Sequence, residues 1–158
     1  MAGLCAGALV EGMQSQKVAA CVKHFCANNK ETNRKESDSH VSERALREIY
    51  LRAFELIVKR AHPWALMTSY NLVNGIHASE NRDLLTGILR EDWGFDGVVT
   101  TDWWTCGEHY LELKAGNDIK MGAGYPDRVK EAYEKGLISK EEISLNARRV
   151  LELLLKLC

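Results

Sequence analysis

The sequence predicts an α/β fold built on a parallel sheet. Short apolar runs alternate along the chain with polar loops and with segments of helical period, which is the pattern of βα units. The run at residues 18–22 has no polar alternation, as is typical of a strand covered on both faces. With 158 residues, 46% of them hydrophobic, the chain is long enough to bury a core and too apolar to be disordered.

The first third of the chain is expected to hold two helices around that strand. Residues 2–15 read as a helix of small residues, and residues 28–40 as a long polar loop. Ser42 is placed to cap the second helix, which Pro63 ends. Its apolar face follows a helical period at Leu46, Ile49, Tyr50, Ala53, Phe54, Ile57 and Ala61.

Three further strands are expected. They lie at residues 64–69 and 98–101 and, more weakly, at residues 118–121, while Asn74-Gly75 marks a turn. Helices are expected over the segments of helical period, at residues 82–91 (capped by Asn81), 109–115, 127–135 and, behind a Ser139–Glu142 capping box, 140–157. These make about four βα units. A complete eight-stranded α/β barrel needs about 250 residues, so the chain suffices for about half of one.

Composition excludes several function classes. Lys and Arg total 21 against 22 Asp and Glu, so the basic excess of a nucleic-acid binder is missing. No apolar run reaches the ~18 residues of a membrane span, and the N-terminus lacks the positive charge of a signal peptide. We therefore expect a cytoplasmic protein without nucleic-acid or membrane partners.

The cysteines and histidines point to neither a disulfide framework nor a metal site. Five cysteines without a CxxC pair favour free, buried thiols in a reducing compartment. Five histidines show no ligand spacing, and no phosphate-binding glycine loop is present. We expect no metal and no cofactor.

Polar pairs follow three predicted strands where each strand ends: Lys23-His24, Tyr70-Asn71 and Asp102-Trp103. In parallel α/β folds the carboxyl ends of the strands carry the site. Asp102 can be a nucleophile, a metal ligand or a helix N-cap, and a nearby cation such as Lys23 would keep it ionised. Trp103 offers a flat face for a sugar ring, or is simply a core residue.

The other candidate residues also have alternative interpretations. Lys23 and His24 supply N–H donors that suit a polyhydroxylated or anionic ligand, although His24 could be structural and Lys23 a Schiff-base lysine. Arg34 could clamp a hydroxyl or hold the nucleophile's charge, and its alternative is a solvated loop residue. Tyr70 could hydrogen-bond the carboxylate, or be an interface aromatic.

These residues lie in motifs that resemble glycoside hydrolase family 3. The likeness covers nearly the whole chain and includes the segments Lys23-His24-Phe25, NNKETNR (28–34), SERALREIYL (42–51), MTSYNLVNG (67–75), LREDWGFDG (89–97), VVTTDW (98–103) and AGNDIKM (115–121). The nucleophile segment of that family usually reads Ser-Asp-Trp, and Thr101 stands here in place of the serine.

The resemblance implies a retaining β-glycosidase, of the β-glucosidase branch, that acts on β-linked glucosides by double displacement. Asp102 matches the nucleophile, and Trp103 a wall of the glycone pocket. Lys23, His24 and Arg34 match residues that bind the hydroxyls of the glycone. Met67 matches a residue that lines the glycone pocket, and Tyr70 matches a tyrosine near the nucleophile.

The resemblance also places the chain within the family's architecture. Residues 1–158 match the second half of a (β/α)8 TIM-type barrel and form one partial barrel domain. The acid/base glutamate of this branch lies in a second domain, which the chain does not contain. The open sheet edges of a half barrel would favour self-association or a complementary barrel chain. The alternatives are a non-catalytic sugar-binding or assembly subunit and, through Lys23, an aldolase.

Overall fold

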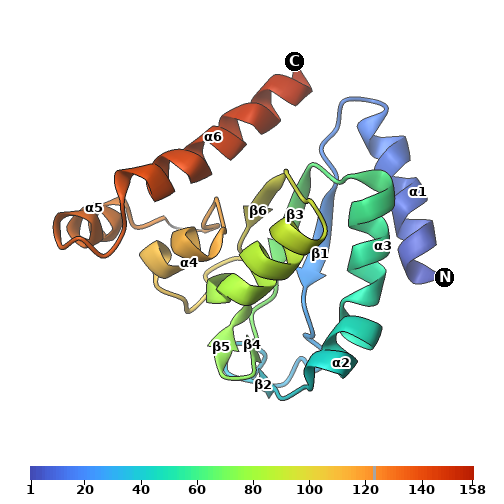
Figure 1. Cartoon of the computed structure of the whole chain (residues 1–158), viewed down its shortest axis with the longest axis horizontal. Coiled ribbons are helices and arrows are strands. Elements are labelled where there is room, and N and C mark those ends of the chain that lie inside the picture. Colours follow the sequence, from blue (N-terminus) through green and yellow to red (C-terminus); the bar gives the residue numbers. More distant parts are fainter. Residues whose placement is uncertain (123) are drawn as a thin grey trace.

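The computed structural model describes residues 1–122 and 124–158 and confirms an α/β fold with a parallel sheet (Figure 1). The sheet has the strand order β1-β3-β6, and both neighbouring pairs are parallel. A second, smaller sheet has the order β2-β4-β5. The strands are β1 (Cys21–Phe25), β2 (Asp38–Ser39), β3 (Ala65–Thr68), β4 (Leu72–Val73), β5 (Ile76–His77) and β6 (Val98–Thr100).

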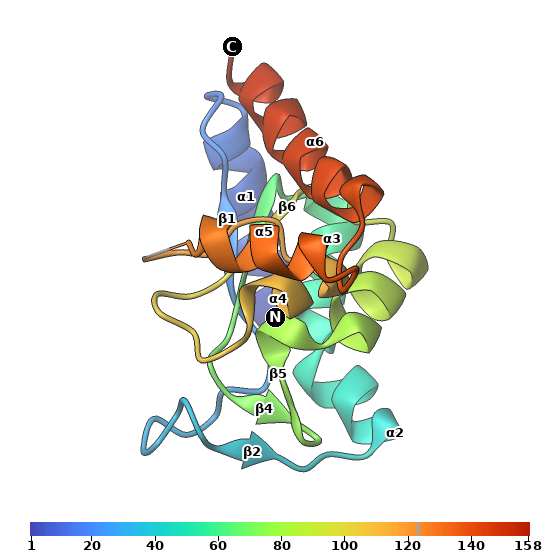
Figure 2. The same cartoon turned by 90° about the vertical axis from the view of Figure 1, so that its left-hand side faces the viewer.

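Helices flank the main sheet, and α1 and α3 run side by side next to β1 (Figure 1). Figure 2 shows α6 rising beyond α4 and α5 toward the C-terminus. None of the helices in the described part of the chain is long and apolar enough to cross a bilayer. The helices are α1 (Ala2–Gln14), α2 (Glu43–Ala45), η1 (Leu46–Tyr50), α3 (Arg52–Ala61), η2 (Ala78–Glu80), η3 (Asp83–Asp92), α4 (His109–Ala115), α5 (Pro126–Glu134) and α6 (Lys140–Leu157).

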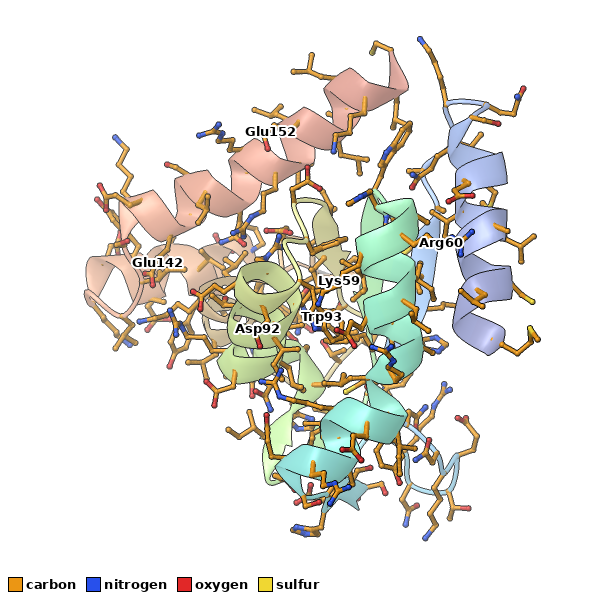
Figure 3. The ribbon with its side chains drawn as sticks, turned by 45° about the vertical axis from the view of Figure 1, so that its right-hand side comes forward. Lys59, Arg60, Asp92, Trp93, Glu142 and Glu152 are labelled. Carbon is orange, nitrogen blue, oxygen red and sulfur yellow. The ribbon has the colours of Figure 1, made fainter. Side chains whose placement is uncertain are left out.

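The predicted helix starts are confirmed by their capping bonds. The Ser42 side chain accepts a hydrogen bond from the Ala45 N–H at 3.3 Å, which satisfies a donor that the helix itself leaves unpaired. Asn81 Oδ1 does the same for the Leu84 N–H at 3.1 Å. Ser139 and Glu142, the latter labelled on α6 in Figure 3, form the expected capping box.

The core lies between the main sheet and the helices that cover it. Phe25 is fully buried, with its ring 5.1 Å from that of Phe54 and 6.1 Å from that of Trp93, both edge to face. Burying a side chain of this size contributes about 1.5–3 kcal/mol. On the other side of α3, Gly3 lets α1 approach closely, since a Cβ there would lie 2.8 Å from the carbonyl oxygen of Ala53.

A buried ion network attaches α6 and η3 to the sheet. The Asp118 side chain accepts hydrogen bonds from Arg90 at 2.8 Å, from Arg149 of α6 at 3.0 Å and from the Val99 backbone N–H at 2.8 Å. Burial lowers the pKa of the Arg90 guanidinium to about 10, against the opposing pull of Asp118, and it raises the pKa of the Asp118 carboxyl. The network therefore joins η3, α6 and β6 through one carboxylate.

Two strand predictions need correction. The first strand begins at Cys21 rather than at Val18, because Lys17 takes a left-handed backbone (φ 57°) after α1 and Val18 remains 51% exposed. The predicted fourth strand at residues 118–121 is only an isolated parallel bridge from Thr100 to Ile119. A regular ladder does not form there, because the Val99 N–H of β6 is already bonded to the side chain of Asp118 and is not free for a backbone carbonyl of this segment.

Three further features differ from the sequence predictions. The polar loop at residues 28–40 contains β2, which pairs with β4 of the hairpin around Asn74-Gly75. The helix after Ser42 is interrupted by the wider π-turn η1. All five cysteines are free, but burial was predicted correctly only for Cys26, and the other four are exposed: Cys5, Cys21, Cys106 and Cys158.

Candidate active site

The three predicted polar pairs lie at the same edge of the main sheet. His24 lies within β1, Tyr70 follows the central strand β3, and Asp102 follows β6. The parallel pairing directs all three carboxyl ends the same way, so residues far apart in sequence meet there. The register shifts within β1 between Val22 and Phe25, where the Lys23–His24 peptide bond is cis.

Asp102 is the centre of this cluster. Its Oδ2 lies 3.3 Å from His24 Nε2, and its Oδ1 accepts a hydrogen bond from the Trp103 backbone N–H at 2.7 Å. The Tyr70 hydroxyl donates a further hydrogen bond to the carboxylate. Asp102 is only 8% exposed, so these neighbours fix the direction in which its oxygens point.

The two side chains that face Asp102 are neutral near pH 7. Burial raises the pKa of the Tyr70 phenol, and the adjacent Asp102 charge raises it further. Burial and then the charge of Lys23 lower the pKa of the His24 imidazole, although Asp102 opposes that shift. Tyr70 therefore keeps its proton. A neutral His24 contacts Asp102 as a hydrogen-bond donor when its proton is on Nε2.

Two cationic side chains lie close to the ring of Tyr70. The Arg34 guanidinium lies 4.5 Å from the ring centroid and Lys35 Nζ lies 5.2 Å from it, both within cation–π range. Arg34 also pairs with Glu31 at 3.0 Å. Arg34 is therefore stacked on an aromatic ring, while its side chain remains 41% exposed.

Hydrogen bonds of the preceding residue, Thr101, hold the segment that carries Asp102 in place. Thr101 is fully buried, its N–H donates to the Ile119 carbonyl at 2.9 Å, and its Oγ1 accepts from the Met121 N–H at 2.9 Å. The segment after β6 is therefore held by hydrogen bonds to Ile119 and Met121, next to the isolated Thr100–Ile119 bridge.

The loop that follows Trp104 rests on a buried polar cluster. Glu112, 1% exposed, accepts hydrogen bonds from Thr105 Oγ1 at 2.7 Å, from Ser79 Oγ at 2.9 Å and from Lys120 Nζ at 2.8 Å. Lys120 also donates to the Gly107 carbonyl at 2.9 Å. Each buried polar group has a partner, so the cluster stabilises the loop beside the site.

The remaining predicted residues occupy different positions around the cluster. Lys23 is exposed and close enough for its charge to shift the pKa of His24. Trp103 is 46% exposed, which excludes a core role. Met67 is half-buried on β3, opposite Thr100. Asn71 belongs to the framework, since its amide donates to the Leu72 carbonyl at 3.0 Å.

Sequence reasoning missed two residues near the site. Lys35 Nζ donates to the carbonyl of Trp104 at 3.1 Å and so connects the loop before β2 with the loop after β6. The Trp104 ring lies 5.2 Å from that of Trp103. A loop lysine carries no local signal of such a contact, whereas the consecutive tryptophans of the sequence could have drawn attention to Trp104.

Two alternative roles of Asp102 find no support in the geometry. The next helix, α4, begins only at His109, and the Asp102 side chain accepts from Trp103 rather than from a helix N–H. Within residues 1–122 and 124–158, no group of three His, Cys, Asp or Glu side chains is placed to hold a metal ion. A buried carboxylate with neutral donors around it suits nucleophilic chemistry.

Comparison with known proteins identifies the family that the chain matches. A model of the glycosyl hydrolase family 3 N-terminal domain matches residues 1–153. β-Glucosidase A of Butyrivibrio fibrisolvens is 57% identical over 143 residues, which are 90% of this chain and 17% of the relative. An exo-α-(1→6)-L-arabinopyranosidase of Bifidobacterium longum is 45% identical over 157 residues, 99% of this chain and 21% of the relative.

Solved structures agree with the sequence relatives. The structure of β-glucosidase 3B from Thermotoga neapolitana in complex with α-D-glucose superposes with a TM-score of 0.94 at 44% identity, covering 98% of this chain and 23% of that one. The chain thus spans about a fifth of the length of the proteins it resembles. Matched by the family model over nearly its whole length, this chain belongs to glycoside hydrolase family 3.

Proposed function

We propose that the chain is the nucleophile-bearing part of a retaining β-glucosidase, with Asp102 as the nucleophile. The observation that carries the proposal is the buried Asp102 carboxylate, contacted by His24, Tyr70 and the Trp103 N–H at the shared carboxyl edge of the strands. The family assignment and the relatives named as β-glucosidases support the same activity.

The reaction would proceed in two displacements. An Asp102 oxygen forms a bond to the anomeric carbon while the glycosidic C–O bond breaks, and an acid protonates the departing oxygen. Water then attacks the same carbon and releases Asp102. A retaining site needs a second carboxyl group about 5–5.5 Å from the first. The chain spans about a fifth of the length of its relatives, and we propose that the acid/base carboxyl belongs to a part of the enzyme outside it.

The surrounding residues would bind the glycone. Lys23, His24 and Arg34 supply N–H donors for sugar hydroxyls, and Trp103 and Met67 supply apolar surface for C–H groups. The relatives carry two kinds of name, β-glucosidase and exo-α-(1→6)-L-arabinopyranosidase. Comparing kcat/KM for 4-nitrophenyl β-D-glucopyranoside and 4-nitrophenyl α-L-arabinopyranoside identifies the preferred glycone.

We also propose that these βα units form part of a (β/α)8 barrel completed by further protein. Exposed leucines along α6 and the open side of β1 support this proposal, because such surfaces are normally covered. The covering protein would be another barrel segment or a second copy of the chain. Molar mass from light scattering distinguishes a self-associating chain from one that needs a different partner. The exposed leucines of α6 are Leu145, Leu151, Leu154, Leu155 and Leu157.

The test of the proposed mechanism is the anomer of the sugar released first. The protein is expressed at the full length of its natural reading frame, and hydrolysis of 4-nitrophenyl β-D-glucoside is followed by proton NMR. We expect β-glucose to appear before mutarotation, and Asp102→Asn, a nearly isosteric change, to lower kcat on the order of 10³-fold or more. Initial release of α-glucose, or undiminished activity of the variant, would contradict the proposal.

A further inference from the structure

Lys35 contacts two of the segments that hold the Asp102 carboxylate. Its Nζ donates a hydrogen bond to the backbone carbonyl of Trp104 at 3.1 Å, and the same Nζ lies 5.2 Å from the centroid of the Tyr70 ring. Lys35 itself belongs to a third segment, the polar loop that precedes β2. One side chain therefore joins the loop before β2, the segment after β3 and the loop after β6.

Both contacts of Lys35 lead to hydrogen-bond donors of Asp102. The Tyr70 hydroxyl donates to the carboxylate, and the Trp103 N–H donates to Asp102 Oδ1 at 2.7 Å. The Trp103 N–H and the Trp104 carbonyl belong to the same short turn, in which the backbone has only two soft dihedral angles per residue. A displacement of the Trp104 carbonyl therefore reorients the N–H that faces Asp102.

The backbone at Trp104 depends on its neighbours for support. It lies in the left-handed region (φ 52°), which costs a non-glycine residue free energy that the surrounding contacts must offset. The Trp104 N–H donates to the Met121 carbonyl at 3.2 Å, and the Trp104 carbonyl accepts from Lys35. Lys35 thus supplies the hydrogen bond on one of the two sides of this strained residue.

The contacts of Lys35 are those of a cation that the protein itself occupies. The neighbouring Arg34 pairs with the carboxylate of Glu31 at 3.0 Å. Lys35 is half-buried and directs its ammonium to a backbone carbonyl and to an aromatic ring. A hydrogen bond from a charged donor is stronger than one between neutral groups. This arrangement suits a residue that fixes other groups rather than one that binds a ligand.

We propose that Lys35 is a positioning residue, which keeps the Tyr70 hydroxyl and the Trp103 N–H directed at Asp102. It contacts neither the sugar nor the reacting atoms and acts through these two donors. The inference rests on the proposed role of Asp102 as the nucleophile. Its consequence is that the rate of attack by Asp102, and not the affinity for the sugar, depends on Lys35.

The experiment measures the rate at which Asp102 is glycosylated. The full-length protein is mixed with 2,4-dinitrophenyl 2-deoxy-2-fluoro-β-D-glucoside at a range of concentrations. Asp102 forms a bond to the anomeric carbon while dinitrophenolate leaves with the electron pair of the broken C–O bond, and its colour follows the reaction. The limiting first-order rate constant reports the attack, the half-saturating concentration reports binding, and the amplitude counts active chains.

The variants separate the contacts of Lys35 from its charge. Lys35→Met nearly keeps the length of the side chain and removes the ammonium, whereas Lys35→Arg keeps a cationic donor. Lys30→Met is the matched control, because it removes the same charge from an exposed position in the same loop. A variant that only destabilises the protein lowers the amplitude and leaves the rate constant of the remaining active chains unchanged.

We expect Lys35→Met to lower the limiting rate constant about ten- to a hundredfold, since a misplaced reacting group has effects of this order. The half-saturating concentration should not change, Lys35→Arg should recover most of the rate constant, and Lys30→Met should match the wild type.

Three results would overturn the positioning role while leaving the proposed function standing. They are an unchanged rate constant in Lys35→Met, a loss confined to the amplitude or to the half-saturating concentration, and a Lys35→Arg or Lys30→Met variant as slow as Lys35→Met. A wild-type protein that is not labelled at Asp102 would overturn the proposed function, and the positioning role with it.

Discussion

His24 Nε2 lies 3.3 Å from Oδ2 of Asp102, although the strands that carry them, β1 and β6, are separated in the sheet by β3. The Tyr70 hydroxyl, which follows β3, donates to the same carboxylate. Three consecutive strands of the sheet therefore each contribute one contact to a single buried group. This arrangement explains how a short chain can hold the Asp102 carboxylate in a defined orientation.

Replacing Tyr70 with Phe should impair the orientation of Asp102. The variant keeps the ring under the Arg34 guanidinium and removes only the hydroxyl that donates to the carboxylate. We expect kcat/KM for 4-nitrophenyl β-D-glucoside to fall about 10²-fold, because small displacements of a reacting group have effects of this size. Arg34→Met, which leaves the hydroxyl in place, should act mainly through KM. Wild-type kinetics for Tyr70→Phe would show that its hydroxyl does not position Asp102.

Replacing Lys120 with Met should destabilise the loop beside the site. The side chains of Lys120 and Glu112 are both almost fully buried, so the variant leaves the Glu112 carboxylate without its cation. Breaking such a pair costs about 3–5 kcal/mol of unfolding free energy, measured by urea denaturation. The double variant Glu112→Gln/Lys120→Met should be more stable than Lys120→Met alone, because the uncompensated charge is gone.

The exposed Lys114 on the same helix as Glu112 provides the control for that experiment. Its Nζ donates to the Leu137 carbonyl near solvent, so Lys114→Met should shift the urea midpoint much less than Lys120→Met. Equal effects of the two lysine substitutions would mean that the buried cluster does not stabilise the loop.

Stability should depend on pH through His109. Burial lowers the pKa of its imidazole from the ordinary value of 6.5, so near that pH the unfolded chain binds more protons than the folded protein. The contribution is complete above about pH 6.5 and is lost as the pH falls toward the lower folded value. His109→Gln should therefore lose less unfolding free energy than the wild type between about pH 7 and pH 5.5. Equal losses would exclude His109 as a source of the pH dependence.

Local signals made much of the fold predictable. Capping residues such as Ser42, Asn81 and Ser139 act on the N–H groups of the following turn, so the sequence alone reveals them. Strands β3 and β6 were also predicted, because continuous apolar runs mark buried strands. The fourth strand was wrong because the side chain of Asp118 takes the N–H group that a ladder would need, which no local pattern reveals.

The candidate site was likewise predictable only where local patterns of the sequence determine it. Strand-end polar pairs predicted His24, Tyr70 and Asp102 as neighbours, since parallel strands bring their carboxyl ends together. The contact of Lys35 with the Trp104 carbonyl depends on the path of two loops, and the sequence contains no periodic signal for it. The same holds for β2, whose two polar residues pair with a distant hairpin.

The measurement that tests the central claim most directly is covalent trapping of Asp102. The full-length protein is incubated with 2,4-dinitrophenyl 2-deoxy-2-fluoro-β-D-glucoside, whose leaving group departs with the electron pair of the broken C–O bond and needs no acid. Intact mass and peptide mapping then locate any adduct. We predict one 2-fluoroglucosyl group per chain, attached to Asp102 and absent from Asp102→Ala. An adduct on another residue, or no adduct at all, would contradict the assignment of Asp102 as the nucleophile.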